Sequence, residues 1–357
     1  MNSENIFDNF YRGKTILVTG GVGTIGSFLV DGLLQLDIKK LICLDNNESE
    51  LFFSEQEHIN DKRFIPAQCD ICNKYEMMRY LTGVDYVFHT AALKHVPSCE
   101  RSPFSAIQTN IIGLENIIRL ARRTRVKKIL FTSSDKAASP TNVMGATKLL
   151  GERLFIAANN SFLDEYGTIF ANTRFGNVAG SRGSVIPLFC NQILNGGPVT
   201  ITSQDMTRFM MTPSDATNLV LESMVYSKGG DTFISKMPTV NIMDLATTII
   251  DLLKPITETN NIPCTIVGAR PGEKLWEELS TSEESRRLIE NEKFLCILPS
   301  ADNIKKEVET KYKDMNFHIS HKIYTSKKER LMTSSEIRDL LLKDYVLPES
   351  IRAKLSI

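Results

Sequence analysis

The stretch Val18-Thr19-Gly20-Gly21-Val22-Gly23-Thr24-Ile25-Gly26 joins a short apolar run to a segment with helical spacing, and it decides the fold. The run Thr15–Thr19 is predicted to be a strand buried on both faces, and Ile25–Leu36 the helix that follows it. Three glycines spaced three residues apart permit a tight turn, close approach of a ligand to the backbone, and close packing of the helix on the strand. Because the helix N-terminus also offers free N–H groups, the turn is predicted to bind a pyrophosphate.

The first half of the chain repeats this alternation of strand and helix. Buried strands are predicted at Leu41–Leu44, Tyr86–His89 and Lys128–Ser133, with Arg63–Ala67 as a weaker candidate. Between them, Ile107–Arg122 carries its apolar residues on one helical face. We therefore expect an α/β fold of the Rossmann type, which is a doubly wound parallel sheet with helices on both faces, together with a smaller α/β substrate-binding lobe.

The lobe is expected beyond about residue 177, where Gly, Ser and Pro cluster and shorter elements follow, among them a helix-rich segment at Val240–Leu253. Thr333–Leu342 is predicted to be a helix in which Thr333 is the N-cap and Glu336 completes a capping box. The expected parts are a dinucleotide-binding domain of residues 1–178 plus roughly 213–240, the lobe of residues 179–212 and 241–300, and a C-terminal extension of residues 301–357.

Composition narrows the class of protein. The 357 residues are 42% hydrophobic and 24% charged, an ordinary soluble composition. Lysine plus arginine equals aspartate plus glutamate at 42 each, so the charge balance indicates neither a nucleic-acid partner nor a polybasic membrane anchor. No run approaches the ~20 apolar residues of a membrane span, and the polar N-terminal segment resembles neither a signal peptide nor a transit peptide. We expect a soluble, cytoplasmic protein.

The cysteines indicate neither a disulfide framework nor a metal site. There are seven, an odd number, and they have no regular spacing. Cys69 and Cys72 form one CxxC pair, but the sequence offers no second pair that would complete a metal site. We therefore expect ordinary thiols and no bound metal.

Asp45 supports a dinucleotide site. It ends the second predicted strand, about 20 residues beyond the glycines, where an acidic residue binds the ribose hydroxyls of NAD. The next five residues, Asn46 to Glu50, include two glutamates and no Arg or Lys. Because a 2′-phosphate would be repelled there, the sequence favours NAD over NADP.

At this point the chain resembles the extended short-chain dehydrogenases/reductases. The segment from Thr19 through Gly26 matches the signature of that superfamily, Asp70-Ile71 matches its adenine-binding pair, and Thr90-Ala91-Ala92 ends the fourth strand against the cofactor. Asn110 lies in a Thr-Asn-x-x-Gly segment typical of the family. The cofactor contacts implied by the resemblance are Thr19, Gly20, Gly23, Thr24, Ile25, Gly26, Asp45, Asp70, Ile71, Ala91, Ala92, Lys94, Asn110 and Lys148.

Further segments are similar to the nucleotide-sugar 4,6-dehydratases of polysaccharide biosynthesis, above all to those that act on UDP-N-acetylglucosamine. The matches run in order over roughly residues 13–298, and the resemblance is thin beyond Pro299. The matching segments begin at Ala91 (AALKHVP), Ser133 (SSDKA), Arg174 (RFGNV), Gly180 (GSRGSV), Met206 (MTRF) and Arg270 (RPGEK).

The resemblance implies a reaction and its catalytic residues. A hydride passes from sugar C4 to NAD, water leaves across C5 and C6, and the hydride returns to C6. This sequence needs a base at C5, an acid for the C6 hydroxyl and stabilisation of the C4 oxygen. The resemblance assigns Asp135 as the acid, Lys136 as the base, Ser134 as a hydrogen-bond donor near the C4 oxygen, and Lys148 as the contact to the nicotinamide ribose.

Met144 departs from the superfamily pattern. The usual Tyr-x-x-x-Lys is here Met144-Gly-Ala-Thr-Lys148, and a thioether neither gives nor takes a proton. Either the domain is a catalytically silent NAD binder, or another group removes the C4 hydroxyl proton. Methionine also occurs here in some sugar dehydratases of this type, which favours the second interpretation, with Asp135 as the substitute.

Basic side chains in the second half are candidates for the substrate diphosphate, because guanidinium groups match phosphate oxygens. A UDP-sugar is favoured over a GDP-sugar, and the resemblance favours retention at C5. Two alternatives stay open, an epimerase or reductase of another UDP- or GDP-sugar and the silent NAD binder. A homodimer is expected through Ile107–Arg122 and Met144–Ala158, where relatives pair. The substrate contacts implied by the resemblance are Lys94, His95, Asn177, Ser181, Arg182, Val185, Arg208, Arg270, Glu273 and Lys274.

Overall fold

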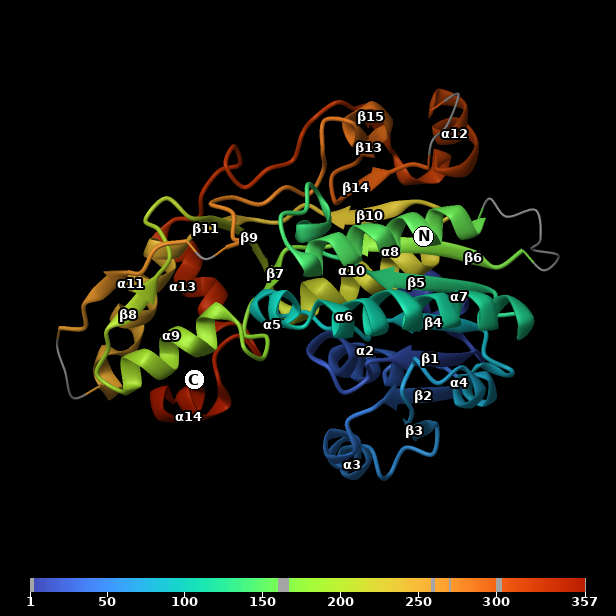
Figure 1. Cartoon of the computed structure of the whole chain (residues 1–357), viewed down its shortest axis with the longest axis horizontal. Coiled ribbons are helices and arrows are strands. Elements are labelled where there is room, and N and C mark those ends of the chain that lie inside the picture. Colours follow the sequence, from blue (N-terminus) through green and yellow to red (C-terminus); the bar gives the residue numbers. More distant parts are fainter. Residues whose placement is uncertain (1–2, 160–166, 258–260, 270, 300–303, 357) are drawn as a thin grey trace.

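A computed structural model of the chain describes residues 3–159, 167–257, 261–269, 271–299 and 304–356. Its larger part is built on a ten-stranded sheet, and a smaller lobe lies at one end of it (Figure 1). The strands in sheet order are β15 (His318–Ser320), β13 (Leu288–Glu290), β14 (Phe294–Ile297), β10 (Thr232–Ser235), β6 (Ile169–Arg174), β5 (Lys128–Thr132), β4 (Tyr86–His89), β1 (Thr15–Thr19), β2 (Lys40–Asp45) and β3 (Phe64–Gln68).

From β10 to β3 every strand is parallel to its neighbour, which confirms the predicted Rossmann-type sheet. The central strands β1, β4 and β5 are buried on both faces, as their uninterrupted apolar sequences indicate. The weaker candidate at Arg63–Ala67 is the edge strand β3, which starts one residue later than predicted.

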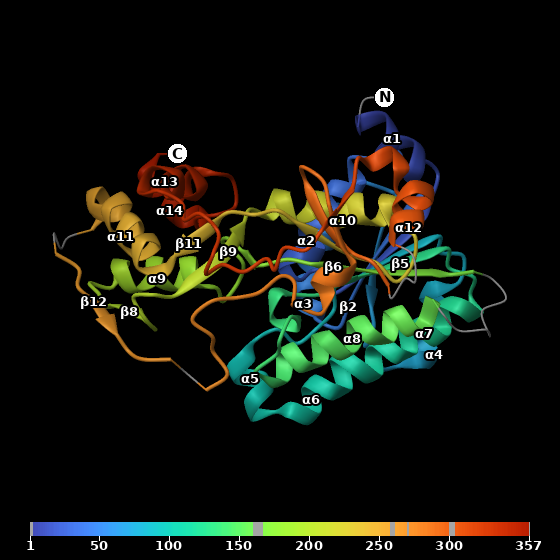
Figure 2. The same cartoon turned by 90° about the horizontal axis from the view of Figure 1, so that it is seen from above.

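Helices cover both faces of this sheet (Figure 2). The helices on one face are α1 (Ser3–Tyr11), α2 (Thr24–Leu34) and α10 (Pro213–Tyr226), and those on the other are α4 (Lys74–Leu81), α7 (Leu114–Arg123) and α8 (Val143–Asn159). The remaining helical elements of this part are α3 (Glu48–Glu57), α5 (Val96–Arg101), α6 (Pro103–Ile107), η1 (Gln108–Gly113), η2 (Asp135–Ala137), η4 (Glu284–Arg287), α12 (Ile304–Lys311) and η5 (Lys313–Met315).

The helix predicted at Ile107–Arg122 is not a single α-helix. Its first turns form the π-helical segment η1, and α7 begins only at Leu114. The Asn110 side chain bonds both the N–H and the carbonyl of Leu93, and Gly113 lies so close to Ile71 that an added Cβ would be 2.6 Å from its Cδ1. Tertiary contacts of this kind, which helical spacing does not encode, accompany the wider turn at Gln108–Gly113.

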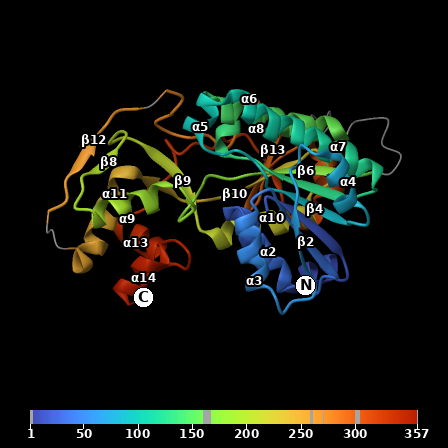
Figure 3. The same ribbon diagram turned by 60° about the horizontal axis from the view of Figure 1, so that its bottom comes forward.

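The lobe has its own hydrophobic core and receives the chain from β6 and β10 (Figure 3). Its core lies between α9, α11 and α13, and includes Phe189, Ile249 and Leu341. Its strands are β7 (Asn177–Val178), β9 (Thr207–Met211) and β11 (Thr239–Asn241) in one sheet, and β8 (Val199–Ile201) and β12 (Cys264–Ile266) in another. Its helices are α9 (Val185–Leu194), α11 (Ile242–Leu253), η3 (Lys254–Ile256), α13 (Ser334–Leu342) and α14 (Glu349–Leu355).

The division expected from the sequence differs from the structure in two places. Strands β13 and β14 fall within the range expected for the lobe, yet they join the main sheet, because β14 pairs antiparallel with β10. The C-terminal extension is shared between the two parts. Strand β15 pairs with β13, whereas α13 packs against α11 in the lobe core. The capping box at Thr333 and Glu336 is confirmed.

The described residues hold neither a membrane-spanning helix nor a cluster of metal-ligating side chains. No helix among them has the length and apolar character needed to cross a bilayer. The same residues contain no group of three or more His, Cys, Asp or Glu side chains that could hold a metal ion, and all seven cysteines are free thiols.

A buried ion cluster ties three elements together at the end of β6. The Arg174 side chain is 1% exposed, and its guanidinium bonds Glu152 of α8 and both carboxylate oxygens of Glu284 in η4, the latter at 3.0 Å each. It also donates to the carbonyl of Leu279 at 2.8 Å. Burial raises the pKa of Glu284, but Arg174 outweighs burial and lowers that pKa to about 2.

Glu284→Gln is therefore expected to lower the free energy of unfolding by about 3–5 kcal/mol at pH 7, since it leaves a buried cation short of one carboxylate. Urea denaturation measures this difference. The wild type should lose the advantage as the pH falls from about 4.5 towards 2, where Glu284 takes up its proton. The neighbouring Glu283→Gln changes a carboxylate that is 63% exposed and pairs with Arg287 at 3.1 Å and with Arg153 at 4.0 Å, and it should cost at most about 1 kcal/mol. Equal effects of the two substitutions would contradict the cluster's role.

Candidate active site

The glycine turn between β1 and α2 presses against the end of β4. Gly20 has a φ of +67°, and an added Cβ would lie 2.7 Å from the Cα and N of Ala91. Gly26 faces the carbonyl of Gly20 with no room for a side chain. Gly23 is the N-cap of α2 and supplies no side-chain cap, so the first N–H groups of that helix are left for a ligand. The bare backbone and helix N-terminus fit the pyrophosphate of a dinucleotide.

Asp45 stands beside this turn, at the end of β2. Its carboxylate accepts hydrogen bonds from the N–H of Val22 at 3.3 Å and of Asn47 at 3.1 Å. The carboxylate is thus held at the edge of the glycine turn, where the ribose next to a bound pyrophosphate would lie.

Of the other predicted cofactor residues, some line a cavity and others hold the lining in place. Thr24, Ile25 and Ala92 line a cavity. Asn110 is buried, and its amide bonds Leu93 and, at 2.9 Å, the hydroxyl of Thr147, so it holds the loop after β4 in place.

Three further residues of this set lie beside the wall. Asp70 accepts from the N–H of Cys72 at 2.8 Å, and Ile71 packs against Gly113. Thr19 is buried and lies 2.7 Å from Nδ1 of His89. Burial and then Lys148 lower the pKa of His89 to about 3, so this histidine is neutral.

A cavity of about 800 Å³ runs from the glycine turn to the lobe. Residues from all three predicted groups, the cofactor, catalytic and substrate residues, line this one cavity. Those that line it are Gly23, Thr24, Ile25, Ala92, Lys94, His95, Ser134, Lys136, Met144, Lys148, Asn177, Ser181 and Arg182.

A hydrogen-bonded acid/base pair stands at the end of β5. The Ser134 hydroxyl donates to Asp135 Oδ1 at 2.8 Å, and Lys136 Nζ donates to the same oxygen at 3.0 Å. Asp135 is fully buried, whereas the Lys136 side chain is 24% exposed and lines the cavity. The short helix η2 places the two adjacent side chains together, with Ser134 as its N-cap.

Lys136 is held as an ammonium ion. Burial alone would lower its pKa, but the carboxylates of Asp135 and Glu277 outweigh burial and hold that pKa above its usual value. The sequence-based role of Lys136 as a base therefore requires that it first lose a proton.

Glu277 is a member of this site that the sequence analysis missed. Its side chain is 4% exposed, and its Oε1 lies 3.8 Å from Lys136 Nζ. Burial, and then the charge of Asp135, raise the pKa of Glu277. The only signal in the sequence was its place three residues after Lys274, just beyond one of the matching segments.

Met144 and Lys148 lie one turn apart near the start of α8. Met144 packs with Cys99 and Ala106 and lines the cavity, so the position usual for tyrosine is an apolar wall. Lys148 Nζ donates to the carbonyl of Thr132 at 2.9 Å, and burial lowers its pKa to about 8. The pKa values of the two lysines of the site, Lys136 and Lys148, are thus shifted in opposite directions.

Two of the predicted phosphate ligands already bond protein groups, and of the two only Arg182 lines the cavity. Arg208 is buried, and its guanidinium donates to the carbonyls of Thr207, Lys274 and Leu275. These bonds hold the segment that follows β12 in place. Arg182 ion-pairs with Glu50 at 2.7 Å and bonds the carbonyl of Val22, so it bridges the lobe to the glycine turn.

The remaining predicted substrate residues are scattered. Lys274 Nζ donates to the carbonyl of Ala138 at 3.1 Å, and Val185 packs on the lobe core at the start of α9. Glu273 is partly exposed, and Arg270 lies outside the described residues. His95 lines the cavity, and burial and then Lys94 lower its pKa.

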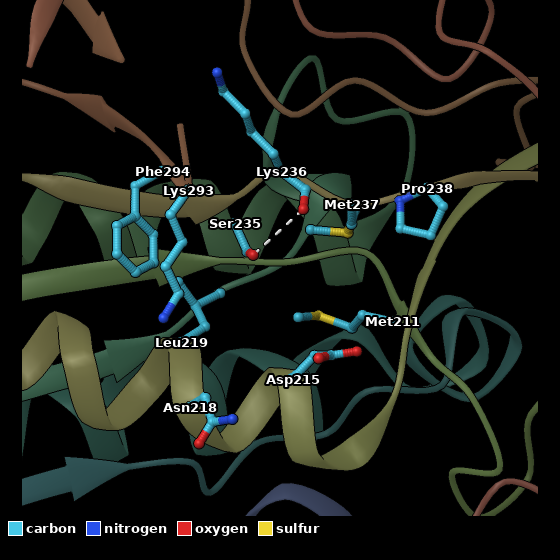
Figure 4. Close-up of a pocket in the computed structure, with 10 residues that line it drawn as sticks. All are labelled: Met211, Asp215, Asn218, Leu219, Ser235, Lys236, Met237, Pro238, Lys293 and Phe294. Atoms are coloured by element: carbon cyan, nitrogen blue, oxygen red, sulfur yellow. Dashed lines mark hydrogen bonds between the residues drawn. The ribbon is translucent and has the colours of Figure 1, made fainter. Parts of the chain in front are cut away.

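A second hollow, of about 340 Å³, lies where β10 ends and α10 begins (Figure 4). Met211 and Met237 face each other across it. Its charged side chains already have partners. Asp215 completes the capping box of α10, Lys236 pairs with Glu290 at 2.8 Å, and Lys293 pairs with Glu222. These pairings leave this hollow without the convergent polar groups of the larger cavity.

The parallel sheet and the glycine turn are those of an extended short-chain dehydrogenase/reductase. More narrowly, the chain belongs to the family described as polysaccharide biosynthesis protein, whose family model matches residues 16–299.

Relatives and solved structures agree with this membership. An uncharacterized membrane protein from Methanocaldococcus jannaschii is 48% identical over 82% of this chain and 87% of its own length. A UDP-glucose 4-epimerase from Rickettsia bellii is 38% identical over 94% of this chain and 98% of its own.

The X-ray structure of Pen from Bacillus thuringiensis is 38% identical, with a TM-score of 0.86 over 93% of this chain and 98% of that one. A dTDP-glucose 4,6-dehydratase from Streptomyces venezuelae with NAD and TYD bound shares the fold at 22% identity, with a TM-score of 0.65 over 73% of this chain and 86% of that one.

Gly20→Ala should abolish measurable binding of NAD, or weaken it by more than about tenfold, since its Cβ would collide with the backbone of Ala91. Isothermal titration calorimetry with NAD measures this. Gly13→Ala is the matched control, because Gly13 has the same φ of +67° and nothing within 4 Å of an added Cβ. Both variants should lose about 1–2 kcal/mol of stability to backbone strain. Unchanged NAD affinity in Gly20→Ala would show that the cofactor site is misplaced.

Proposed function

We propose that this protein is an NAD-dependent 4,6-dehydratase that converts UDP-N-acetylglucosamine to a UDP-4-keto-6-deoxy-N-acetylhexosamine with retention at C5. The observation that carries the proposal is the Ser134–Asp135–Lys136 arrangement at the cavity wall. It combines a carboxylate, an amine and a hydroxyl at the carboxyl end of a parallel strand, the edge at which such sheets bind ligands.

The cofactor would lie along the glycine turn. Bound NAD would supply the acceptor for a hydride from sugar C4 and the source of the hydride for C6. The backbone at Gly20 and Gly23 would hold the pyrophosphate, Asp45 a ribose, and Lys148 the nicotinamide ribose. A bound NAD is supported by the glycine geometry and by the acidic surroundings of Asp45, where Glu50 pairs with Arg182.

Ser134 and Asp135 would carry the C4 hydroxyl proton. Because the Ser134 hydroxyl already donates to Asp135, it can pass a proton from the C4 hydroxyl to that carboxylate. Asp135 thus accepts the proton that the thioether of Met144 cannot take. Asp135, now protonated, would return this proton to the C6 hydroxyl as the C–O bond breaks and water leaves. The proton gained at C4 is thus the one lost at C6.

Lys136, in its neutral form, would take the C5 proton. Its ammonium, whose protons exchange with solvent, would protonate C5 after the hydride returns. The ammonium state of Lys136 in this structure means that one proton must leave before Lys136 can take the C5 proton. Protonation of Asp135 favours that loss, because it removes one of the two negative charges that hold the ammonium. The rate of dehydration should accordingly rise with pH through the pKa of Lys136.

Two cationic groups near the lobe would face the diphosphate of the substrate. Lys94 and Arg182 both line the cavity, and Lys94 Nζ donates to the carbonyl of Arg182 at 3.1 Å. Positive charge at this place suits a nucleoside diphosphate. The relative from Rickettsia bellii named for a UDP-sugar supports UDP as the nucleotide.

Epimerisation of a UDP-sugar is the second candidate, and the relative named as an epimerase favours it. Epimerisation at C4 breaks no C–O bond, so it needs no acid for a leaving hydroxyl. The Asp135–Lys136 pair favours dehydration for that reason.

Proton NMR of the purified protein with NAD and UDP-N-acetylglucosamine in deuterated water tests the proposal. A new C6 methyl signal with deuterium at C5 is expected, and the ring couplings should show retention. A C4 epimer without a methyl signal would establish epimerisation instead. No turnover despite bound NAD would support the silent NAD binder.

Asp135→Asn and Lys136→Ala should each lower product formation by at least about 10²-fold and leave NAD affinity unchanged, because they remove the proton carriers and not the cofactor site. The methyl signal and NAD titration measure the two effects. Lys127→Ala is the matched control, since this exposed lysine lies just before the amino end of β5. Full activity of Lys136→Ala would overturn its role as the base.

We also propose that the enzyme is a homodimer. Apolar side chains are exposed on neighbouring elements, and they would be covered by a second copy. They are Phe104 (84% exposed) and Ile107 of α6, Ile112 of η1 and Leu150 of α8.

Phe104→Glu should therefore convert the dimer to a monomer, because it places a charge in the apolar contact. Light scattering coupled to size exclusion measures the mass. Tyr75→Glu is the control, as Tyr75 is equally exposed, at 81%, on α4. A wild type that runs as a monomer would contradict the proposal.

A further inference from the structure

Four charged groups form a cluster at the cavity wall, and all of them except Lys136 are buried. Lys136 Nζ lies 3.0 Å from Asp135 Oδ1 and 3.8 Å from Glu277 Oε1, and Arg208 Nε lies 3.8 Å from the same oxygen of Glu277. Of the four, Lys136 lines the cavity. Glu277 therefore reaches the reaction through Lys136.

We propose that Glu277 is a positioning residue that holds the Lys136 side chain beside Asp135 and controls its protonation, and that Ser326 of the C-terminal segment holds Glu277 in place. This inference rests on the proposed function, because it names the group that regulates the proposed C5 base.

Hydrogen bonding does not explain the burial of Glu277. Its Oε2 is buried and has no hydrogen-bond partner among the described residues. The terminal nitrogens of Arg208 donate to the carbonyls of Thr207, Lys274 and Leu275. Arg208 therefore makes no bidentate contact with Glu277. Burying a carboxylate oxygen that accepts no hydrogen bond costs free energy. We therefore attribute the place of Glu277 to its negative charge.

The backbone of Glu277 is held from both sides by one residue. Ser326 N–H donates to the carbonyl of Glu277 at 2.9 Å, and Glu277 N–H donates to the Ser326 hydroxyl at 3.0 Å. Ser326 is fully buried, and its hydroxyl also lies 2.9 Å from that of Thr207, next to Arg208. The C-terminal segment thus reaches the back of the active site.

The charges that surround Lys136 set the direction of the effect. Burial lowers its pKa, Asp135 and Glu277 raise it, and Arg208 lowers it. Glu277 in turn faces Asp135, Lys136, Arg208 and Lys274. Without the charge of Glu277, one carboxylate remains against burial and Arg208, so Lys136 should lose its proton at lower pH.

The test follows Lys136 directly, by ¹⁵N NMR of the lysine side chains in the NAD-loaded protein, with the signal assigned by its absence in Lys136→Arg. In Glu277→Gln the midpoint of its titration should fall by about 1–3 pH units. Glu277→Asp keeps the charge and should shift it less. In assays with UDP-N-acetylglucosamine, the rising limb of kcat against pH should move down by the same amount.

Glu278→Gln is the matched control, because it makes the same change one residue on, at a residue that meets Thr325 through its backbone. Ser326→Ala is a second variant, expected to move the midpoint in the same direction by less, and it serves if Glu277→Gln fails to fold. Equal midpoints in wild type, Glu277→Gln and Ser326→Ala would overturn the inference. A wild type that makes no methyl product would overturn only the proposed function, since the NMR titration needs no turnover.

Discussion

One buried cation, Arg174, organises the active site. From the end of β6 it bonds Glu152 on α8 and Glu284 in η4, and it also holds the carbonyl of Leu279. Helix α8 carries Met144 and Lys148, and the segment that ends at η4 carries Glu277. The guanidinium thus holds both α8 and the segment that carries Glu277 against β6. A fork of donors with permanent charge suits this task, because it can engage two carboxylates at once without losing its proton.

Local surroundings give two similar lysines different states. Lys148 is buried against the ring of Phe131 and a backbone carbonyl, and burial brings its pKa to about 8. Lys136 is flanked by Asp135 and Glu277, and these charges outweigh burial. The first arrangement suits a lysine that orients a cofactor and favours deprotonation of nearby hydroxyls. In the mechanism we propose, the second arrangement holds a proton that Lys136 loses once Asp135 is protonated.

The cofactor half of the site could be predicted because its signals are local. A buried strand, a glycine turn and a helix follow one another within 20 residues, and Asp45 lies at the end of the next strand. The capping box at Thr333 is equally local, since its partners are three residues apart. Arg208 and Arg182 could not be placed in this way. An arginine has the same sequence signature whether it binds phosphate or braces a loop, and only the carbonyls around Arg208 decide which.

By itself, the sequence determined the parallel Rossmann-type sheet, the dinucleotide turn and the adjacent Ser134, Asp135 and Lys136. Periodicity, glycine spacing and the order of neighbouring residues can be recognised without knowledge of the fold. Tertiary structure alone decided that β13, β14 and β15 extend the main sheet, that α13 completes the lobe core, and that Glu277 meets Lys136. The physical reason is distance along the chain. Lys136, Arg208, Glu277 and Ser326 are far apart in sequence, and the contacts that set their charge exist only after the sheet and lobe have packed.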